Sequence, residues 1–122
     1  VINAWNRPRL EDILADGYRV VITSEEGEEA LYVVPSMGRK PGEYGYFDSK
    51  KIYEQWSPQT HPNVNGFKVC LWTNDAEDQE DDWYDRFIDL PIAVLAERTW
   101  DIKHDPSIEQ FQHRLEKVIF PF

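Results

Sequence analysis

The chain has 122 residues, enough for one domain with a modest hydrophobic core. Its 23 acidic and 13 basic residues give a net charge of −10, which repels phosphate groups and therefore argues against nucleic acids and anionic membrane surfaces as partners. No apolar run approaches the roughly 20 residues that a membrane span requires, so no membrane partner is expected. The single cysteine, Cys70, excludes an internal disulfide and leaves a cytoplasmic and a secreted or cell-surface location equally open.

A compact β-α-β unit is predicted for the first 23 residues. Residues 1–5 form a short β-prone run, and Pro8 suits the beginning of a helix. Gly17 supplies the left-handed end of that helix. Residues 18–23 are almost continuously apolar, which is typical of a strand covered on both faces. The helix itself is indicated by apolar residues at helical spacing, namely Leu10, Ile13 and Leu14.

The middle of the chain is predicted to be less regular. Residues 31–34 form a brief extended piece, and residues 35–48, with three glycines and two prolines, form a long loop. Loops of this length in compact domains tend to be functional or disordered. A short helix over residues 49–55 and a third strand over residues 67–72 follow.

Two or three helices are predicted for the last third. Trp83, Phe87 and Ile88 have helical spacing, and Pro91 is expected to begin a further helix, since proline interrupts helical hydrogen bonding. Glu97 and Arg98 are expected to form an ion pair, and Trp100 to pack its helix against neighbouring elements. Asp105 and Pro106 would open the last helix. Its buried face would comprise Ile108, Phe111, Leu115 and Val118.

This order of elements predicts an α/β fold with about three parallel strands and outer helices, in one domain over residues 1–122. A complete (β/α)8 barrel needs roughly 250 residues, so the chain corresponds to a partial barrel. Because the chain begins at Val1 without a signal region, we expect it to be part of a longer protein. A small doubly wound domain is the alternative, but no G-x-G-x-x-G sequence follows any predicted strand, which argues against nucleotide binding.

Aromatic residues lie at the predicted strand ends, where α/β barrels carry their functional groups. Trp5 ends the first strand, Tyr32 lies just beyond the second, and Trp72 ends the third, before Asn74 and Asp75. Sugar rings stack on indoles and hydrogen-bond to phenols and amides, so these residues could form a sugar-binding hollow. The alternative is that each ring belongs to the core.

No cofactor or metal is expected. The acidic residues 75–82 lack the order and the glycine of a calcium-binding loop and are predicted to be a solvated loop. The three histidines have no partner four residues away on a helix, as a zinc site would require. They are His61, His104 and His113. Cys70 has no neighbouring base and is expected to be a small buried residue.

Several segments occur in the order found in the last three β/α units of family 20 glycoside hydrolases, the β-N-acetylhexosaminidases, which the chain resembles over nearly its whole length. The most specific are the W-T-N stretch beginning at Trp72 and the stretch from Leu90 to Trp100. The others are VINAWN from Val1, GYRVVI from Gly17, LY from Leu31 and IYEQWSP from Ile52.

The resemblance implies exo-acting hydrolysis of terminal N-acetylhexosamine by a substrate-assisted retaining mechanism. Tyr32 would hydrogen-bond the substrate's acetamido oxygen as that oxygen becomes the nucleophile. Trp5 would form a wall of the acetamido pocket, and Trp72 the platform beneath the terminal sugar. Asn74 stands where the family has an acid that binds distal hydroxyls, a role that Asp75 could take instead.

The family's catalytic Asp-Glu pair occurs nowhere in the chain, so this segment alone is expected to be inactive. Val34 also stands where many members carry an aspartate. The expected partners are N-acetylhexosamine-containing glycans and the rest of the barrel, and the isolated segment is expected to self-associate through its open strand edges. A non-catalytic carbohydrate-binding domain, or a self-associating α/β domain with open strand edges, is the alternative.

Overall fold

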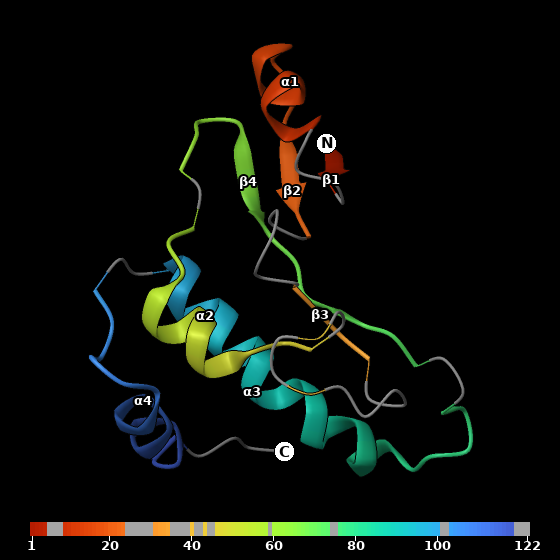
Figure 1. Cartoon of the computed structure of the whole chain (residues 1–122), viewed down its shortest axis with the longest axis vertical. Helices are drawn as coiled ribbons and strands as arrows, with labels where there is room; N and C mark the ends of the chain where they lie inside the picture. Colours follow the sequence, from red (N-terminus) through yellow and green to blue (C-terminus); the bar gives the residue numbers. More distant parts are fainter. Residues whose placement is uncertain are drawn as a thin grey trace.

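The computed structural model describes residues 1–4, 9–23, 31–34, 40, 43, 46–58, 60–73, 76–100 and 103–118, with the side chain of Tyr32 excepted. Figure 1 shows the elements in these ranges. In chain order they are β1 (Ile2–Ala4), α1 (Leu10–Ala15), β2 (Val20–Ile22), β3 (Tyr32–Val33), α2 (Ser49–Gln55), β4 (Val64–Phe67), β5 (Cys70–Leu71), α3 (Asp81–Trp100) and α4 (Ile108–Leu115).

The described strands form two small parallel sheets. One has three strands in the order β1-β2-β4, and the other pairs β3 with β5. Ile2 lies opposite Val20 in the first sheet, and Tyr32 lies opposite Cys70 in the second. The predicted α/β class and the three parallel strands are therefore confirmed.

One extended segment, residues 64–72, belongs to both sheets. Its amides at Lys68 and Cys70 donate to the carbonyls of Ile22 and Leu31, at 2.8 and 2.9 Å. These two donors are two residues apart, whereas their acceptors are nine residues apart in the chain. Residues 20–23 and 31–34 therefore pair with the same neighbouring segment. The third strand was predicted at residues 67–72. It begins earlier, at Val64, because its first residues pair with β2 across a β-bulge.

The second strand is only partly covered. Val20 and Ile22 are fully buried, as predicted, but Val21 is half-buried and Tyr18 is 56% exposed. Burial on both faces was therefore wrong for this strand. The reason is that helix α1 packs on one face alone, against Ala4, Val20 and Ile22.

Helix α1 ends as its sequence predicts. Gly17 has a φ of +84°, and the Gly17 and Tyr18 amides donate to the carbonyls of Leu14 and Ile13, at 3.0 and 3.2 Å. These two bonds form a Schellman motif, which satisfies carbonyls that a helix end leaves unpaired. The motif turns the chain back so that β2 can run parallel to β1.

Replacing Gly17 with Ala is expected to lower the free energy of unfolding by about 1–2 kcal/mol, since a side chain disfavours the left-handed backbone conformation. The space around Gly17 is open, so no steric contact adds to this cost. Gly66→Ala is the matched control, because Gly66 is equally open and its φ lies outside the left-handed region. Urea denaturation of both variants measures the difference; equal losses would contradict the backbone explanation.

Helix α3 is continuous from Asp81 to Trp100, so the prediction that Pro91 begins a separate helix was wrong. Proline inside a helix costs about 3 kcal/mol. Here Pro91 is itself buried, and residues on both sides of it pack into one core. That shared packing holds the two halves in a single helix. These residues are Phe87, Ile88, Leu90, Ala93, Val94 and Leu95.

Helix α4 begins at Ile108, two residues later than predicted, because the Ser107 hydroxyl caps it by accepting from the Gln110 amide at 3.3 Å. Ile108 and Phe111 are buried and Leu115 packs against the same core, as predicted. Val118 lies beyond the helix and is half exposed, so its assignment to the buried face was wrong.

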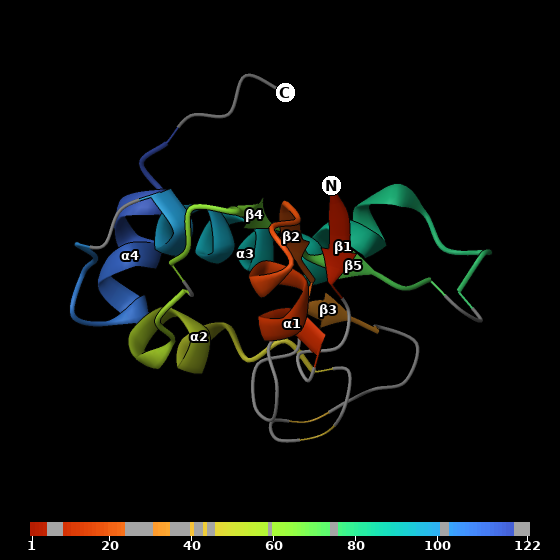
Figure 2. The ribbon, with the colours of Figure 1, turned by 90° about the horizontal axis from the view of Figure 1, so that it is seen from above.

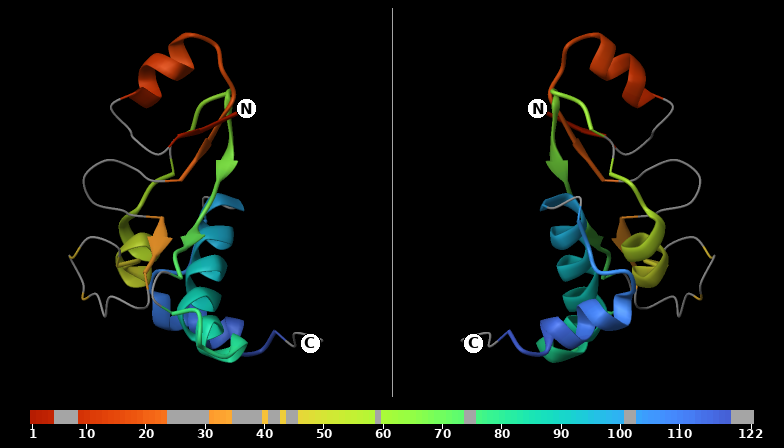
Figure 3. Two further views of the ribbon diagram at one scale, coloured as in Figure 1. Left: turned by 90° about the vertical axis from the view of Figure 1, so that its right-hand side faces the viewer. Right: turned by 90° about the vertical axis from the view of Figure 1, so that its left-hand side faces the viewer.

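The core has two clusters. The larger gathers residues of β3, α2, α3 and α4, and the smaller places α1 on β1 and β2. Figure 3 shows α1 at one end of the molecule and α3 with α4 at the other, and in Figure 2 α2 lies beside α4. Phe67 contacts both clusters and meets the Trp56 ring edge-on at 5.2 Å.

Candidate functional site

The structure describes only part of the predicted sugar-binding site. Trp5, Asn74 and Asp75 lie outside the described residues, as does the side chain of Tyr32. The backbone of Tyr32 is described, and Trp72 is described fully and is half-buried. Whether the predicted rings share one hollow therefore stays a prediction.

The backbones of Tyr32 and Trp72 belong to neighbouring strands. Tyr32 lies in β3, opposite Cys70, beyond the second strand and within the extended piece predicted for residues 31–34. Trp72 directly follows β5, and its amide donates to the carbonyl of Val33 at 2.8 Å. Tyr32 thus begins β3, and Trp72 follows the carboxyl end of its partner β5, two residues beyond the position opposite Tyr32. The structure brings these two predicted positions together.

Side chains alternate along the extended segment that carries Trp72. Val69 and Leu71 pack against the larger core cluster, on the side of α2 and α3. Lys68, Cys70 and Trp72 therefore occupy the opposite face. Cys70 is half-buried, so its assignment to the core was wrong; it lies on the face that the helices leave uncovered.

The same face continues onto the three-stranded sheet with polar groups that sequence reasoning did not single out. The Lys68 ammonium donates to Asn3 Oδ1 at 3.3 Å. Thr23, directly after β2, is 1% exposed, and its hydroxyl has no hydrogen-bond partner among the described residues. The sequence signal for this group was Lys68, a charged residue within an otherwise apolar strand pattern. Its hydrogen bond to Asn3 depends on the strand order of the sheet, which no single motif encodes.

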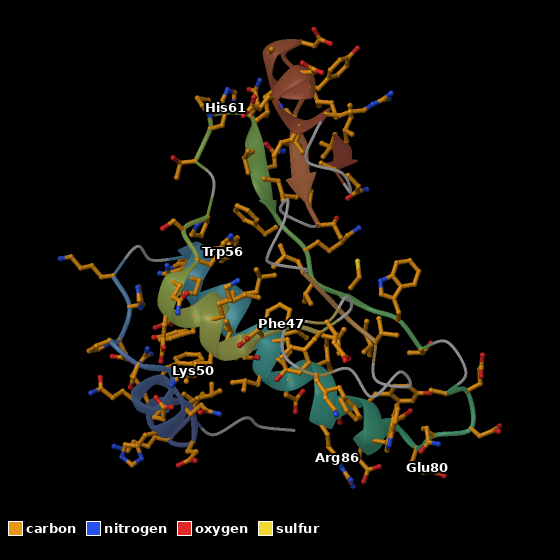
Figure 4. All side chains as sticks on the ribbon, viewed as in Figure 1. Phe47, Lys50, Trp56, His61, Glu80 and Arg86 are labelled. Atoms are coloured by element: carbon orange, nitrogen blue, oxygen red, sulfur yellow. The ribbon has the colours of Figure 1, made fainter. Side chains whose placement is uncertain are left out.

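A shallow hollow of about 620 Å³ lies along β4. It is lined by Thr60, His61, Pro62, Val64, Asn65, Gly66, Phe67 and Thr99. Figure 4 shows His61 in the connection that leads into β4. The hollow thus runs along β4 and the connection that leads into it. Trp72 is not among its lining residues, so it does not correspond to the predicted sugar site.

Charged side chains near the end of α3 stabilise the helical layer. Arg98, 6% exposed, donates to the Trp56 carbonyl, and burial lowers its pKa. Glu97 instead pairs with Arg114, which also binds Asp105 at 3.0 Å, and these two carboxylates raise the pKa of Arg114. The predicted Glu97–Arg98 ion pair was therefore wrong, since successive helical residues point in different directions.

Trp100 was predicted to pack its helix against neighbours, but its side chain is 93% exposed. Of the histidines, His61 and His113 are exposed, whereas His104 is half-buried with its ring edge-on to Tyr53 at 5.3 Å. Within the described ranges, no three His, Cys, Asp or Glu side chains lie close enough to hold a metal ion.

Comparison with known proteins adds no assignment. No protein-family model, curated protein or solved structure matches the chain. Among the helices that the structure describes, none has both the length and the apolar character needed to cross a membrane. Arguments about function therefore depend on the residues themselves.

Proposed function

We propose that this chain is the C-terminal part of the catalytic α/β barrel of an exo-acting β-N-acetylhexosaminidase. The observation that carries the proposal is the pairing of β3 with β5, because it puts the backbone of Tyr32 on the strand next to the one that leads into Trp72. In α/β barrels, substrate-binding groups come from such strand ends.

The arrangement of helices also supports an arc of a barrel. Phe67, Val69 and Leu71 are every second residue of the segment 64–72 and therefore share one face. That face packs against the two core clusters, which contain residues of α1, α2, α3 and α4. Helices on a single side of parallel strands suit a barrel, whose outer face alone carries helices. A doubly wound sheet would carry helices on both faces.

In the proposed reaction, the substrate's own acetamido oxygen attacks the anomeric carbon and forms a cyclic intermediate, which water then opens with net retention. The Tyr32 hydroxyl would donate a hydrogen bond to the acetamido group and hold it in line for attack. Trp72 would stack beneath the terminal sugar, and Trp5 would enclose the acetamido methyl group. Asn74 or Asp75 would bind distal hydroxyl groups.

The acid that protonates the leaving oxygen and the carboxylate that orients the acetamide would come from another part of the barrel, since the chain contains no Asp-Glu pair. The 122 residues alone are accordingly expected to release no product. Activity would require the complete gene product in which this segment occurs.

Tyr32→Phe in the complete gene product is expected to lower kcat for 4-nitrophenyl N-acetyl-β-D-glucosaminide by roughly 10²-fold, because one hydrogen bond to the reacting oxygen is lost. KM should change little, since that bond strengthens mainly in the transition state. Steady-state kinetics of released nitrophenol measures both constants.

Tyr18→Phe provides the matched control, because Tyr18 is exposed and separated from the strand ends, and it should leave kcat unchanged. Absence of hydrolysis by the wild-type gene product towards both N-acetylglucosaminide and N-acetylgalactosaminide substrates would refute the proposal. So would equal kcat values for wild type and Tyr32→Phe.

A further inference from the structure

The three-stranded sheet has a face without a described helix. Ala4 and Ile22 point towards α1, so alternation turns Asn3 and Val21, which lie opposite each other, to the other side. Ile22 also lies opposite Phe67, and the next residues, Thr23 and Lys68, therefore follow Val21 on that face.

Lys68 spans this face. Lys68 directly follows β4, and Asn3 belongs to β1. Since β4 and β1 are the two outer strands of the sheet, the 3.3 Å bond from Lys68 Nζ to Asn3 Oδ1 crosses over the level of β2. Lys68 makes no ion pair with any described residue, although acidic residues outnumber basic ones by 23 to 13 in the chain. An ammonium bound only to a neutral amide retains its full charge for a further partner.

Thr23 supplies a second, independent observation. Its amide donates to the carbonyl of Ala4 at 3.0 Å, which fixes it at the carboxyl end of β2. Its side chain is 1% exposed, yet its hydroxyl has no partner within the described part of the chain. Buried hydroxyl groups are almost always hydrogen-bonded, so a buried one left unpaired indicates a missing acceptor.

The groups that remain on this face are all donors or can act as donors. With Asn3 Oδ1 occupied by Lys68, the amide protons of Asn3 and the remaining ammonium protons of Lys68 are available, and the enclosed hydroxyl of Thr23 lacks an acceptor. These hydrogen-bond donors surround the single positive charge of Lys68. They therefore favour a ligand whose oxygen atoms accept hydrogen bonds and carry one negative charge. A doubly charged phosphate is disfavoured by the net charge of −10.

We propose that Asn3, Thr23 and Lys68 form a binding site for a small carboxylate ligand on the face of the β1-β2-β4 sheet opposite α1. The carboxylate would bridge the Lys68 ammonium and the Asn3 amide, and one of its oxygens would accept from Thr23. This inference goes beyond the proposed hydrolase function and stands independently of it, because it uses none of the predicted sugar-binding residues.

An NMR titration of the 122-residue chain tests the site. Sodium acetate should shift the backbone amides of Asn3, Thr23 and Lys68 saturably, with a Kd on the order of 1 mM, typical of a very small ligand. Sodium chloride at equal ionic strength should shift them linearly and less. Glucuronate separates the two sources of a carboxylate, since tighter binding than acetate assigns a sugar acid and equal binding a simple organic acid.

Variants make the test specific. Lys68→Met should weaken acetate binding by at least about tenfold through loss of the charge, and Thr23→Val by about fivefold through loss of one hydrogen bond. Asn3→Asp should abolish acetate binding, because the carboxylate introduced at position 3 would form an ion pair with the Lys68 ammonium. Lys117→Met removes an exposed lysine elsewhere and should bind acetate as the wild type does.

Several results would overturn the proposal. These are acetate shifts no larger than those of chloride, unchanged affinity in Lys68→Met, or tighter binding of inorganic phosphate than of acetate. Retention of the amide resonances of α1 and of Val20 and Ile22, which belong to the same core cluster as the sheet, shows in each variant that the sheet is intact. If Lys68→Met fails this check, Thr23→Val and Asn3→Asp decide the question.

Discussion

Tyr53→Ala is expected to lower the free energy of unfolding by about 3–5 kcal/mol, as truncation of a buried aromatic side chain does. Tyr53 is 0% exposed, its ring stacks on Phe111 at 4.7 Å, and it meets His104 edge-on. Its hydroxyl also accepts from the Asp105 amide at 3.0 Å. One side chain thus joins α2 to α4 and to the segment that precedes α4.

Two further variants separate these contributions in urea denaturation. Tyr53→Phe keeps the ring and loses only the hydrogen bond to Asp105, so it should cost about 1 kcal/mol. Tyr18→Ala truncates an exposed tyrosine and should change stability by less than about 0.5 kcal/mol. A loss below about 1 kcal/mol in Tyr53→Ala would show that Tyr53 does not hold the helices together.

Leu10→Ala should destabilise the smaller core cluster by about 2–5 kcal/mol, the usual cost of truncating a buried leucine. Leu10 is 1% exposed and is the most buried residue that α1 places on the three-stranded sheet. Because this cluster is small, few neighbours are present to fill the cavity. We therefore expect a value in the upper part of the range.

Amide hydrogen exchange should localise the effect. Protection should fall first in β1, β2 and β4, whereas the amides of α2 and α3 should be affected less, since they belong to the larger cluster. Ile92→Ala is the matched control, because Ile92 lies on α3 and is half exposed. A uniform loss of protection over the whole chain would show that the two clusters unfold as one unit.

Local signals predicted the regular parts of the fold well. Gly17 correctly marked the end of α1, and helix α2 has the predicted bounds, with the Asp48 side chain accepting from the Lys51 amide at 3.0 Å. Apolar runs correctly indicated parallel strands. These features depend on residues close together in sequence, which is why the sequence is sufficient to predict them.

The features that the sequence did not predict depend on distant contacts. Pro91 interrupts helical hydrogen bonding locally, but packing on both sides of it keeps α3 whole. The exposure of Trp100 could not be predicted from its hydrophobic side chain. Whether another element covers the end of α3 depends on the tertiary fold. Arg98 similarly binds the carbonyl of Trp56, 42 residues away.

The candidate sites divide in the same way. The positions of Tyr32 and Trp72 followed from the rule that function gathers at strand ends, and their backbones do lie on paired strands. The group of Asn3, Thr23 and Lys68 has no sequence motif. It becomes visible only once the strand order places β1 and β4 on either side of β2.

The separate hydrogen bonds of residues 64–72 to Ile22 and to Leu31 have a consequence for protein engineering. Because the chain returns to hydrogen-bond the same neighbour at Leu31, the alignment on each side is set by separate bonds and not by the intervening length. Either alignment should therefore survive a change that weakens the other, so loss of the Lys68–Ile22 bond need not shift the register of β3 against β5.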